Sequence, residues 1–227
     1  MEKASPILVL LPGLGADHRL FDPQRSEFPN LVSPAWLEPA ASESLASYAG
    51  RMAERIRAEL PDGNRPLVVG GVSFGGMLAT QMAPLLKPDA VVLIGSAMRP
   101  KEIAFSLKVM AMAGRWMPAP VGDNAKFMGR AFIRRLGPMK REHRLFLESM
   151  IDAVPFSFLQ WAGQAIFGWD GVSEVDCKLV RIHGELDRII PFPKAGLVHK
   201  IVGAGHVPNV SHADEVNRHL KAIVRNA

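Results

Sequence analysis

The sequence has little cysteine and no long apolar run. Cys177 is the only cysteine among 227 residues, which excludes an intramolecular disulfide framework and a zinc site built from several cysteines. The longest uncharged stretch, 66–86, contains four glycines and Pro84, and it fits strand, turn and helix better than a membrane span. The apolar run Ile7–Leu11 is too short, and too closely preceded by Glu2, for a secretory signal. A cytoplasmic protein is therefore expected.

Acidic residues are scarce in one segment. Residues 99–147 contain 11 Lys and Arg but only 3 Asp and Glu, so they carry +8 while the rest of the chain carries −3. The basic side chains include two groups that are close in sequence: Arg130, Arg134 and Arg135, then Lys140, Arg141 and Arg144. The net charge of +5 therefore belongs to one part of the chain.

Six short apolar runs alternate with helix-length segments, and no internal repeat is present. The expected strands are Ile7–Leu11, Leu31–Ala35, Leu67–Gly70, Ala90–Ile94, Leu179–Ile182 and Val198–Val202. Several are nearly continuous in Val, Ile and Leu, as strands covered on both faces should be. The second is the weakest because Pro34 interrupts it. The alternation predicts an α/β fold: a mostly parallel sheet of about six strands with helices on both faces.

Three helices are expected around this sheet. Apolar residues recur at helical spacing over residues 44–60, and Phe74–Leu86 follows the third strand as a second helix. The last helix is expected to begin near Ser211, because Asp214 three residues later resembles a capping box.

The segment 99–170 interrupts the alternation. It contains no evident strand and is divided into helix-like pieces by glycines and prolines. Since so long a structureless loop is improbable in a compact domain, we expect a helical cap inserted after the fourth strand. Residues 1–98 and 171–227 would then form the core. The Met, Trp and Phe residues of the cap are expected to pack it onto the core, with some of them lining a pocket.

The sequence from Gly71 to Gly76, Gly-Val-Ser-Phe-Gly-Gly, follows an apolar strand and opens a helix. A Gly-x-Ser-x-Gly string alone is weak, but this context is typical of a nucleophile elbow. The turn strains the serine backbone, and glycines two residues before and after it avoid steric clashes. We therefore predict that Ser73 is a nucleophile, whereas a plain Gly-rich turn is the structural alternative.

A serine nucleophile needs a base and a carboxylate that orients it. Among seven histidines, His206 alone follows the last strand and precedes the last helix, which puts it at the same sheet edge as Ser73. Asp187 follows the fifth strand and is the expected carboxylate, with Glu185 as its nearest rival and Asp214 as a weaker one. The order Ser…Asp…His is that of α/β-hydrolases.

The oxyanion of the intermediate needs two hydrogen-bond donors. The backbone N–H of Phe74, at the start of a helix, is one candidate, and the N–H of Leu14 in the loop after the first strand is the other. Gly13 and Gly15 also suggest a dinucleotide fingerprint, but the next residues do not complete Gly-x-Gly-x-x-Gly. No cofactor and no metal are expected.

These motifs resemble the α/β-hydrolase superfamily over nearly the whole chain. The matching parts are the Pro12–Gly15 loop, the Gly71–Gly76 elbow, Gly184–Asp187 and Gly205-His206. The insertion after the fourth strand is where this family carries its cap. Two positions depart from the common pattern, because Pro12 and Val72 stand where family members often have histidine.

The resemblance also narrows the range of reactions that the chain is expected to catalyse. Related dehalogenases and epoxide hydrolases use an aspartate nucleophile, and the latter also use cap tyrosines, whereas here the elbow carries Ser73 and the only tyrosine is Tyr48. Prolyl aminopeptidases have acidic caps, but this cap is basic. Carboxylesterases and thioesterases remain, and the small capped carboxylesterase of biotin synthesis fits the size best. The resemblance thus implies a serine hydrolase acting on a small-molecule ester or thioester.

Two other functions stay open at this point. The same triad can catalyse acyl transfer or carbon–carbon bond hydrolysis, and a ligand receptor can retain it with little turnover.

The basic cap is an ordinary solvated surface in the simplest interpretation. The functional alternative is docking of an anionic acyl carrier, either coenzyme A or an acidic carrier protein. A nucleic-acid role is disfavoured because the cap accompanies an intact hydrolase site.

Overall fold

The computed structural model describes residues 5–61, 65–104, 129 and 132–227. Its six strands are β1 (Ile7–Leu11), β2 (Leu31–Val32), β3 (Leu67–Val72), β4 (Ala90–Ile94), β5 (Lys178–Gly184) and β6 (Val198–Ile201). They form one sheet in the order β2-β1-β3-β4-β5-β6, and every neighbouring pair is parallel. The predicted α/β fold is confirmed, with β1 and β4 buried along their whole length.

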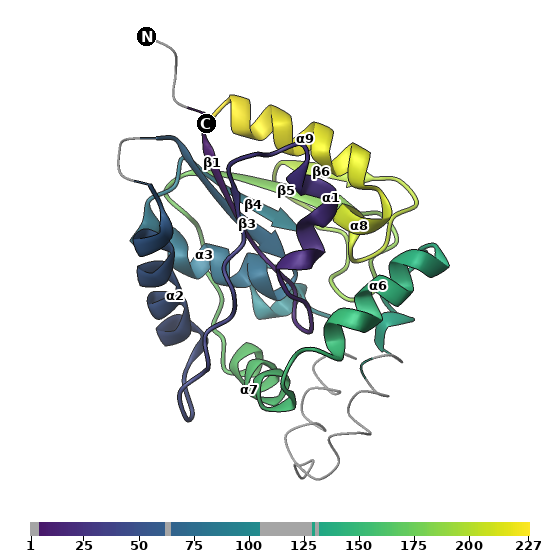
Figure 1. The fold of residues 1–227 in the computed structure, drawn as a ribbon, viewed down its shortest axis with the longest axis horizontal. Coiled ribbons are helices and arrows are strands. Elements are labelled where there is room, and N and C mark those ends of the chain that lie inside the picture. Colours follow the sequence, from purple (N-terminus) through teal and green to yellow (C-terminus); the bar gives the residue numbers. More distant parts are fainter. Residues whose placement is uncertain (1–4, 62–64, 105–128, 130–131) are drawn as a thin grey trace.

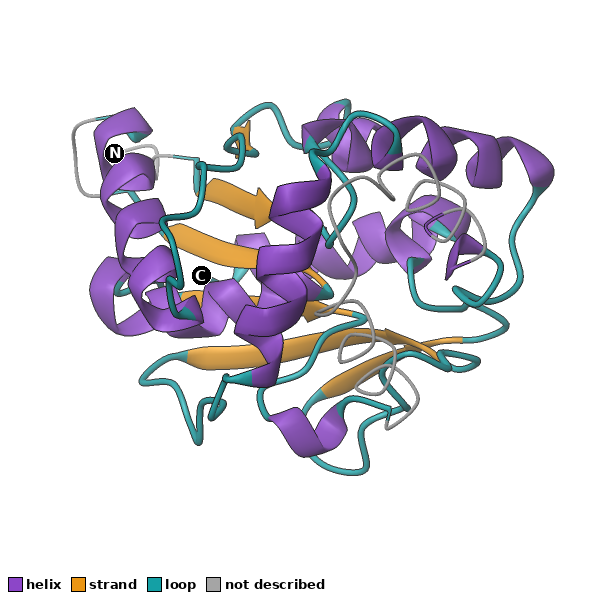
Figure 2. Ribbon diagram, turned by 90° about the horizontal axis from the view of Figure 1, so that it is seen from below, coloured by secondary structure: helices purple, strands orange, loops and turns teal. Residues whose placement is uncertain are grey.

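Helices cover both faces of this sheet (Figures 1 and 2). The core helices are α1 (Asp22–Arg25), α2 (Leu45–Glu59), α3 (Phe74–Leu86), α8 (Pro208–Ser211) and α9 (Ala213–Arg225), with the short 3-10 helix η1 at His18–Phe21. On one face α3 packs against β3 and β4, with α2 beside it. On the other face α9 packs on β5 and β6, next to α1 and α8. Ser44 caps α2 by accepting a hydrogen bond from the N–H of Ser47.

Two expectations about local structure are wrong, the length of the second strand and the capping box at Ser211. The second strand is reduced to two residues, because the chain leaves the sheet edge before Pro34, which has no N–H for a ladder hydrogen bond. The capping box at Ser211 does not form: Pro208 starts the short helix α8, His212 separates it from α9, and the Ser211 hydroxyl donates to the carbonyl of Val207 instead. The last two helices are therefore distinct.

The segment between β4 and β5 begins with the 3-10 helix η2 (Pro100–Glu102) and continues to α6 (Arg141–Ile151) and α7 (Phe156–Phe167). In Figure 1 the two helices lie beyond one end of the sheet. The described part of this segment contains no strand, as expected. Residues 105–128, which include several of its Met and Trp residues, lie outside the described residues, as does Arg130. None of the described helices is both long enough and apolar enough to cross a membrane.

Candidate active site

Ser73 lies in a strained turn between β3 and α3. Its φ is 51° and its ψ is −115°, a conformation that costs free energy for a residue with a side chain. Glycine is required on both sides of it. A Cβ at Gly71 would lie 2.4 Å from the carbonyl carbon of Gly75, and a Cβ at Gly75 would lie 2.2 Å from the carbonyl oxygen of Leu11. The turn has the geometry expected of a nucleophile elbow.

Asp187 and His206 form a hydrogen-bonded pair at the same edge of the sheet. Nδ1 of His206 lies 2.8 Å from Oδ2 of Asp187, and the two side chains are only 4% and 0% exposed. The other carboxylate oxygen accepts hydrogen bonds from the N–H groups of Ile189 (2.8 Å) and Ile190 (3.0 Å). A carboxylate facing Nδ1 favours the tautomer that carries its proton there, which leaves Nε2 of His206 free to accept a proton.

His183, a residue that the sequence did not single out, also contacts this carboxylate. It lies in β5 with no exposed surface, and its Nε2 is 3.2 Å from Oδ2 of Asp187 and 2.8 Å from the carbonyl oxygen of Ile190. Burial alone would raise the pKa of Asp187. The charge interaction with His206 and hydrogen bonds from His183 and His206 outweigh burial, so the pKa is held well below its usual range.

The rival carboxylates lie elsewhere. Glu185 is exposed, forms an ion pair with Lys200 at 3.1 Å and accepts a hydrogen bond from the N–H of Gly203. Asp214 lies exposed in the first turn of α9. Neither is hydrogen-bonded to His206, which is also the only one of the seven histidines that lines the pocket described below.

The two expected oxyanion donors lie near Ser73. The loop after β1 passes close to the serine, since a Cβ at Gly13 would lie 3.7 Å from the Cβ of Ser73. Gly15 in this loop has a positive φ of 80°, and a Cβ there would lie 3.1 Å from Cγ1 of Ile151 on α6. Within the described residues, the N–H groups of Leu14 and Phe74 donate to no protein acceptor. Both donors are therefore available to a ligand.

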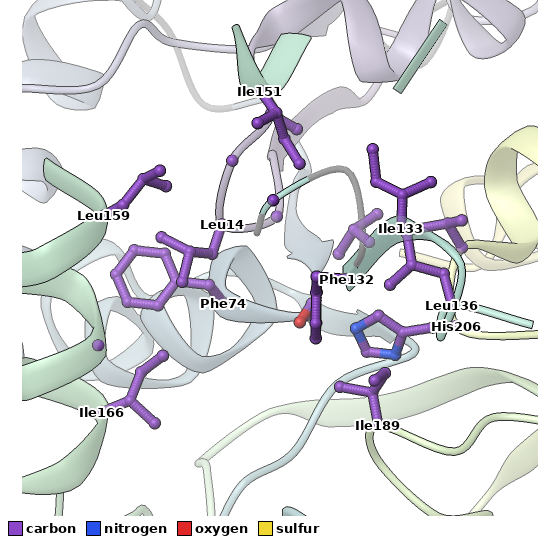
Figure 3. A pocket seen from close by; sticks show the side chains of 18 of the residues that line it. Leu14, Phe74, Phe132, Ile133, Leu136, Ile151, Leu159, Ile166, Ile189 and His206 are labelled. Atoms are coloured by element: carbon purple, nitrogen blue, oxygen red, sulfur yellow. The ribbon is translucent and has the colours of Figure 1, made fainter. Parts of the chain in front are cut away.

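A cavity of about 400 Å³ joins these groups (Figure 3). Ser73 and His206 line it, but their side chains form no hydrogen bond with each other in the described structure. Such bonds often form only when substrate is bound. Among the described lining residues the only other polar side chain is Gln160, and none is charged. In its described part, the site is thus an apolar chamber whose polar side chains are the hydroxyl of Ser73, the imidazole of His206 and the amide of Gln160.

The segment between β4 and β5 provides much of the chamber. Helix α7 contributes Leu159 and Ile166, α6 contributes Ile151, and Phe132 stands between the Phe74 side and the His206 side in Figure 3. The opposite side of α7 is anchored to the core. Its Trp161 donates from Nε1 to the carbonyl oxygen of Glu43 at 2.9 Å, and an aromatic cluster surrounds it. The cluster consists of Trp36, Tyr48, Phe74, Phe158 and Trp161.

The described residues contain no group of three or more His, Cys, Asp or Glu side chains that could hold a metal ion. Free Cys177 lies away from the cavity, and burial raises the pKa of its thiol, which makes it a poorer nucleophile at neutral pH.

Comparison with known proteins decides the family. The model of the alpha/beta hydrolase family matches residues 8–219, which is nearly the whole chain. The chain belongs to this family. The expected hydrolase class is therefore confirmed at family level. No curated protein matches the sequence, so the resemblance to the carboxylesterase of biotin synthesis stays a prediction.

Solved structures share the fold of this hydrolase at low sequence identity. A thermophilic esterase from Thermogutta terrifontis has a TM-score of 0.79 at 18% identity, covering 99% of this chain and 90% of that one. An esterase from Exiguobacterium antarcticum has a TM-score of 0.76 at 16% identity, covering 99% of this chain and 93% of that one. A bromoperoxidase from Bacillus anthracis has a TM-score of 0.77 at 14% identity, covering 98% of this chain and 93% of that one. At such identities the likeness concerns the fold.

Proposed function

We propose that this hydrolase cleaves a carboxylic ester or thioester through a Ser73-His206-Asp187 triad and an acyl-enzyme intermediate. The single observation that carries the proposal is the buried 2.8 Å contact between His206 and Asp187, at the cavity that the strained Ser73 also lines. Structural likeness to two proteins described as esterases supports the same reaction class.

In the first half of the reaction, Oγ of Ser73 attacks the acyl carbon while Nε2 of His206 takes the hydroxyl proton. The carbonyl oxygen becomes an oxyanion held by the N–H groups of Leu14 and Phe74. His206 then gives its proton to the leaving oxygen or sulfur, and the acyl group stays on Ser73. In the second half, His206 activates a water molecule that releases the acid and restores the serine.

Asp187 has two roles in this scheme. It holds the imidazole of His206 in the tautomer that presents Nε2 to Ser73, and its negative charge stabilises the imidazolium that forms during attack. The low pKa of Asp187 keeps the carboxylate ionised throughout. Because the pair is buried, little water screens this interaction.

The test is turnover of a p-nitrophenyl ester by the purified protein and by Ser73→Ala. The wild type should release nitrophenol in many cycles, whereas the variant should lose about 10⁴-fold or more in kcat, with the same fold and melting temperature. Ser47→Ala, an exposed serine on α2, is the matched control and should keep full activity. Turnover by Ser73→Ala would overturn the triad, and one nitrophenol per chain without further cycles would indicate a receptor.

We also propose that residues 99–170 act as the cap and residues 1–98 and 171–227 as the core. The N–H of Val172 donates to the carbonyl of Met98 at 2.7 Å, so the two ends of the insertion leave the core at one place. An insertion whose two ends meet at one place can carry the specificity of the site without altering the order of the strands in the sheet.

An anionic acyl carrier is the partner that fits the basic cap. Arg134 and Arg135 are exposed. Replacing both by Glu should lower kcat/KM for an acyl-CoA several-fold, with the loss fading at high salt, and should leave a neutral ester unchanged. The control replaces Arg218 and Arg225, two exposed arginines on α9. Equal losses on both substrates would remove the carrier from the proposal.

A further inference from the structure

One side of the peptide between Ser73 and Phe74 faces away from the substrate. In a trans peptide the carbonyl and the N–H point in opposite directions, and the described chain has no cis peptide. The N–H of Phe74 is the proposed oxyanion donor. A group bound to the carbonyl of Ser73 therefore fixes the direction in which that donor points.

Ser96 binds this carbonyl. Its hydroxyl donates to the carbonyl oxygen of Ser73 at 2.6 Å, and Ser96 has no exposed surface. Two backbone N–H groups of α3, from Gly76 at 3.0 Å and Met77 at 3.2 Å, reach the same oxygen. The side chain of Ser96 thus makes the shortest of three contacts to one atom of the elbow, and it comes from the loop after β4, a different part of the chain.

The elbow leaves space for this serine. A Cβ at Gly76 would lie 2.4 Å from Oγ and 2.6 Å from Cβ of Ser96. The φ of Gly76 is not positive, so the space taken by Ser96, and not backbone conformation, requires glycine at this position. The last glycine of the Gly71–Gly76 motif therefore belongs to the contact with Ser96 as well as to the turn.

The loop that carries Ser96 is itself held on its other sides. The preceding Gly95 has a φ of +50°, and a Cβ there would lie 2.3 Å from the carbonyl oxygen of His206. Nη1 of Arg181, 7% exposed in β5, is 3.4 Å from the carbonyl of Ser96 and 2.7 Å from a carboxylate oxygen of Glu102 in η2. The carboxylate of Glu102, which is half-buried, thus pairs with the buried charge of Arg181 beside this loop.

We propose that Ser96 is a positioning residue for the oxyanion hole, an inference that rests on the proposed serine hydrolase mechanism. Together with the two N–H groups of α3, its hydrogen bond limits rotation of the Ser73–Phe74 peptide. It also polarises the peptide, and hydrogen bonds in series strengthen each other in a buried site, so the N–H of Phe74 becomes a stronger donor. A merely structural hydroxyl would stabilise the fold without acting on the transition state.

The experiment compares Ser96→Ala with Thr80→Val. Thr80 is a matched control, because its buried hydroxyl donates to a backbone carbonyl of the same helix, that of Met77, at 2.7 Å. Steady-state rates on a p-nitrophenyl ester are divided by the number of sites titrated with a fluorophosphonate, so that only folded enzyme is counted. Ser96→Ala should lose about tenfold in kcat with KM within twofold, since the oxyanion forms only in the transition state. Thr80→Val should stay within twofold of wild type.

A transition-state analogue gives a second readout. A trifluoromethyl ketone forms an oxyanion on Ser73, so its inhibition constant should rise in Ser96→Ala by the same factor as kcat/KM falls. Ser96→Gly removes the same hydroxyl and should show the same loss, which provides a second variant if Ser96→Ala folds poorly.

The outcomes separate this inference from the proposed function. A kcat within twofold of wild type in Ser96→Ala, an equal loss in Thr80→Val, a loss confined to KM, or unchanged affinity for the ketone would each overturn the role of Ser96 while leaving the triad intact. Activity in Ser73→Ala would instead overturn the mechanism on which the role rests.

Discussion

The wall of the cavity that comes from the sheet is held by polar contacts and strained backbone, whereas helix α7 on the opposite wall is held mainly by aromatic packing. Ser73 has a positive φ, and Asp187 accepts from two side chains and two backbone N–H groups. In contrast, Phe158 and Trp161 of α7 pack against core aromatic rings, and the indole of Trp161 donates a hydrogen bond to the core. Polar geometry changes activity when disturbed by fractions of an ångström, whereas apolar packing tolerates substitution at modest cost. Chemistry and specificity should therefore respond to different mutations.

The largest expected effect, after loss of the nucleophile itself, is at Asp187. Asp187→Asn should lower kcat by about 10⁴-fold, because an amide favours the wrong tautomer of His206 and cannot stabilise its imidazolium. Glu185→Gln is the matched control and should stay near wild type in steady-state assays. If the control is the damaging change, the orienting carboxylate has been assigned to the wrong residue.

The pH dependence of kcat/KM tests the same wall of the cavity, which contains His206 and is supported by Asp187. Protonated His206 cannot accept the proton of Ser73, so kcat/KM should fall as the pH is lowered. The pKa of Asp187 is held well below its usual range, so this carboxylate stays ionised there and the acid limb should follow a single proton. A rate that is flat well below about pH 5 would contradict a histidine base.

A cap residue should change selectivity more than rate. Phe132→Ala removes the ring that stands in the middle of the chamber in Figure 3, so longer or bulkier acyl groups should gain relative to short ones by about tenfold in kcat/KM. Phe146→Ala, also on the cap but outside the lining, should leave the chain-length profile unchanged. A uniform fall in kcat for all esters would show that the cap wall takes part in the chemistry.

The smallest expected effect is at the anchor of α7. Trp161→Phe keeps an aromatic ring but loses the hydrogen bond to the carbonyl of Glu43, which should cost about 1 kcal/mol of unfolding free energy and about 2–4 °C in melting temperature. The kcat on a short ester should stay within twofold. A large loss of kcat at an unchanged melting temperature would place α7 in the polar wall.

The sequence predicts much of the fold because its strands are continuous apolar runs. The bounds of β1, β4 and α3 agree with the expected ranges, since each is set by a local pattern. The errors at β2 and at the start of α9 arise where a proline imposes a backbone conformation that the apolar pattern does not report. The segment 105–128 lies outside the described residues, so the expectations placed on its Met and Trp residues stay predictions.

The residues of the site also divide into those that a local sequence pattern predicts and those that it does not. The placement of Ser73, Asp187 and His206 at one edge of the sheet could be predicted because each follows a strand, and parallel strands end at one edge. The contacts of His183 and Ser96 could not be predicted, since the neighbouring sequence contains no motif that indicates them. His183 lies inside a strand, and Ser96 reaches the elbow only because β4 lies beside β3 in the sheet. Contacts between neighbouring strands are set by the packing of the whole sheet and leave no local spacing to read.

The central claim is that Ser73 is the nucleophile that attacks an ester or thioester, and covalent labelling tests it most directly. The intact protein is incubated with a fluorophosphonate, and the modified residue is located by peptide mass spectrometry in the wild type, Ser73→Ala and Asp187→Asn. The account predicts one adduct per chain on Ser73, none in Ser73→Ala, and much slower labelling in Asp187→Asn. An adduct on another serine, or equal labelling of the wild type and Ser73→Ala, would contradict it.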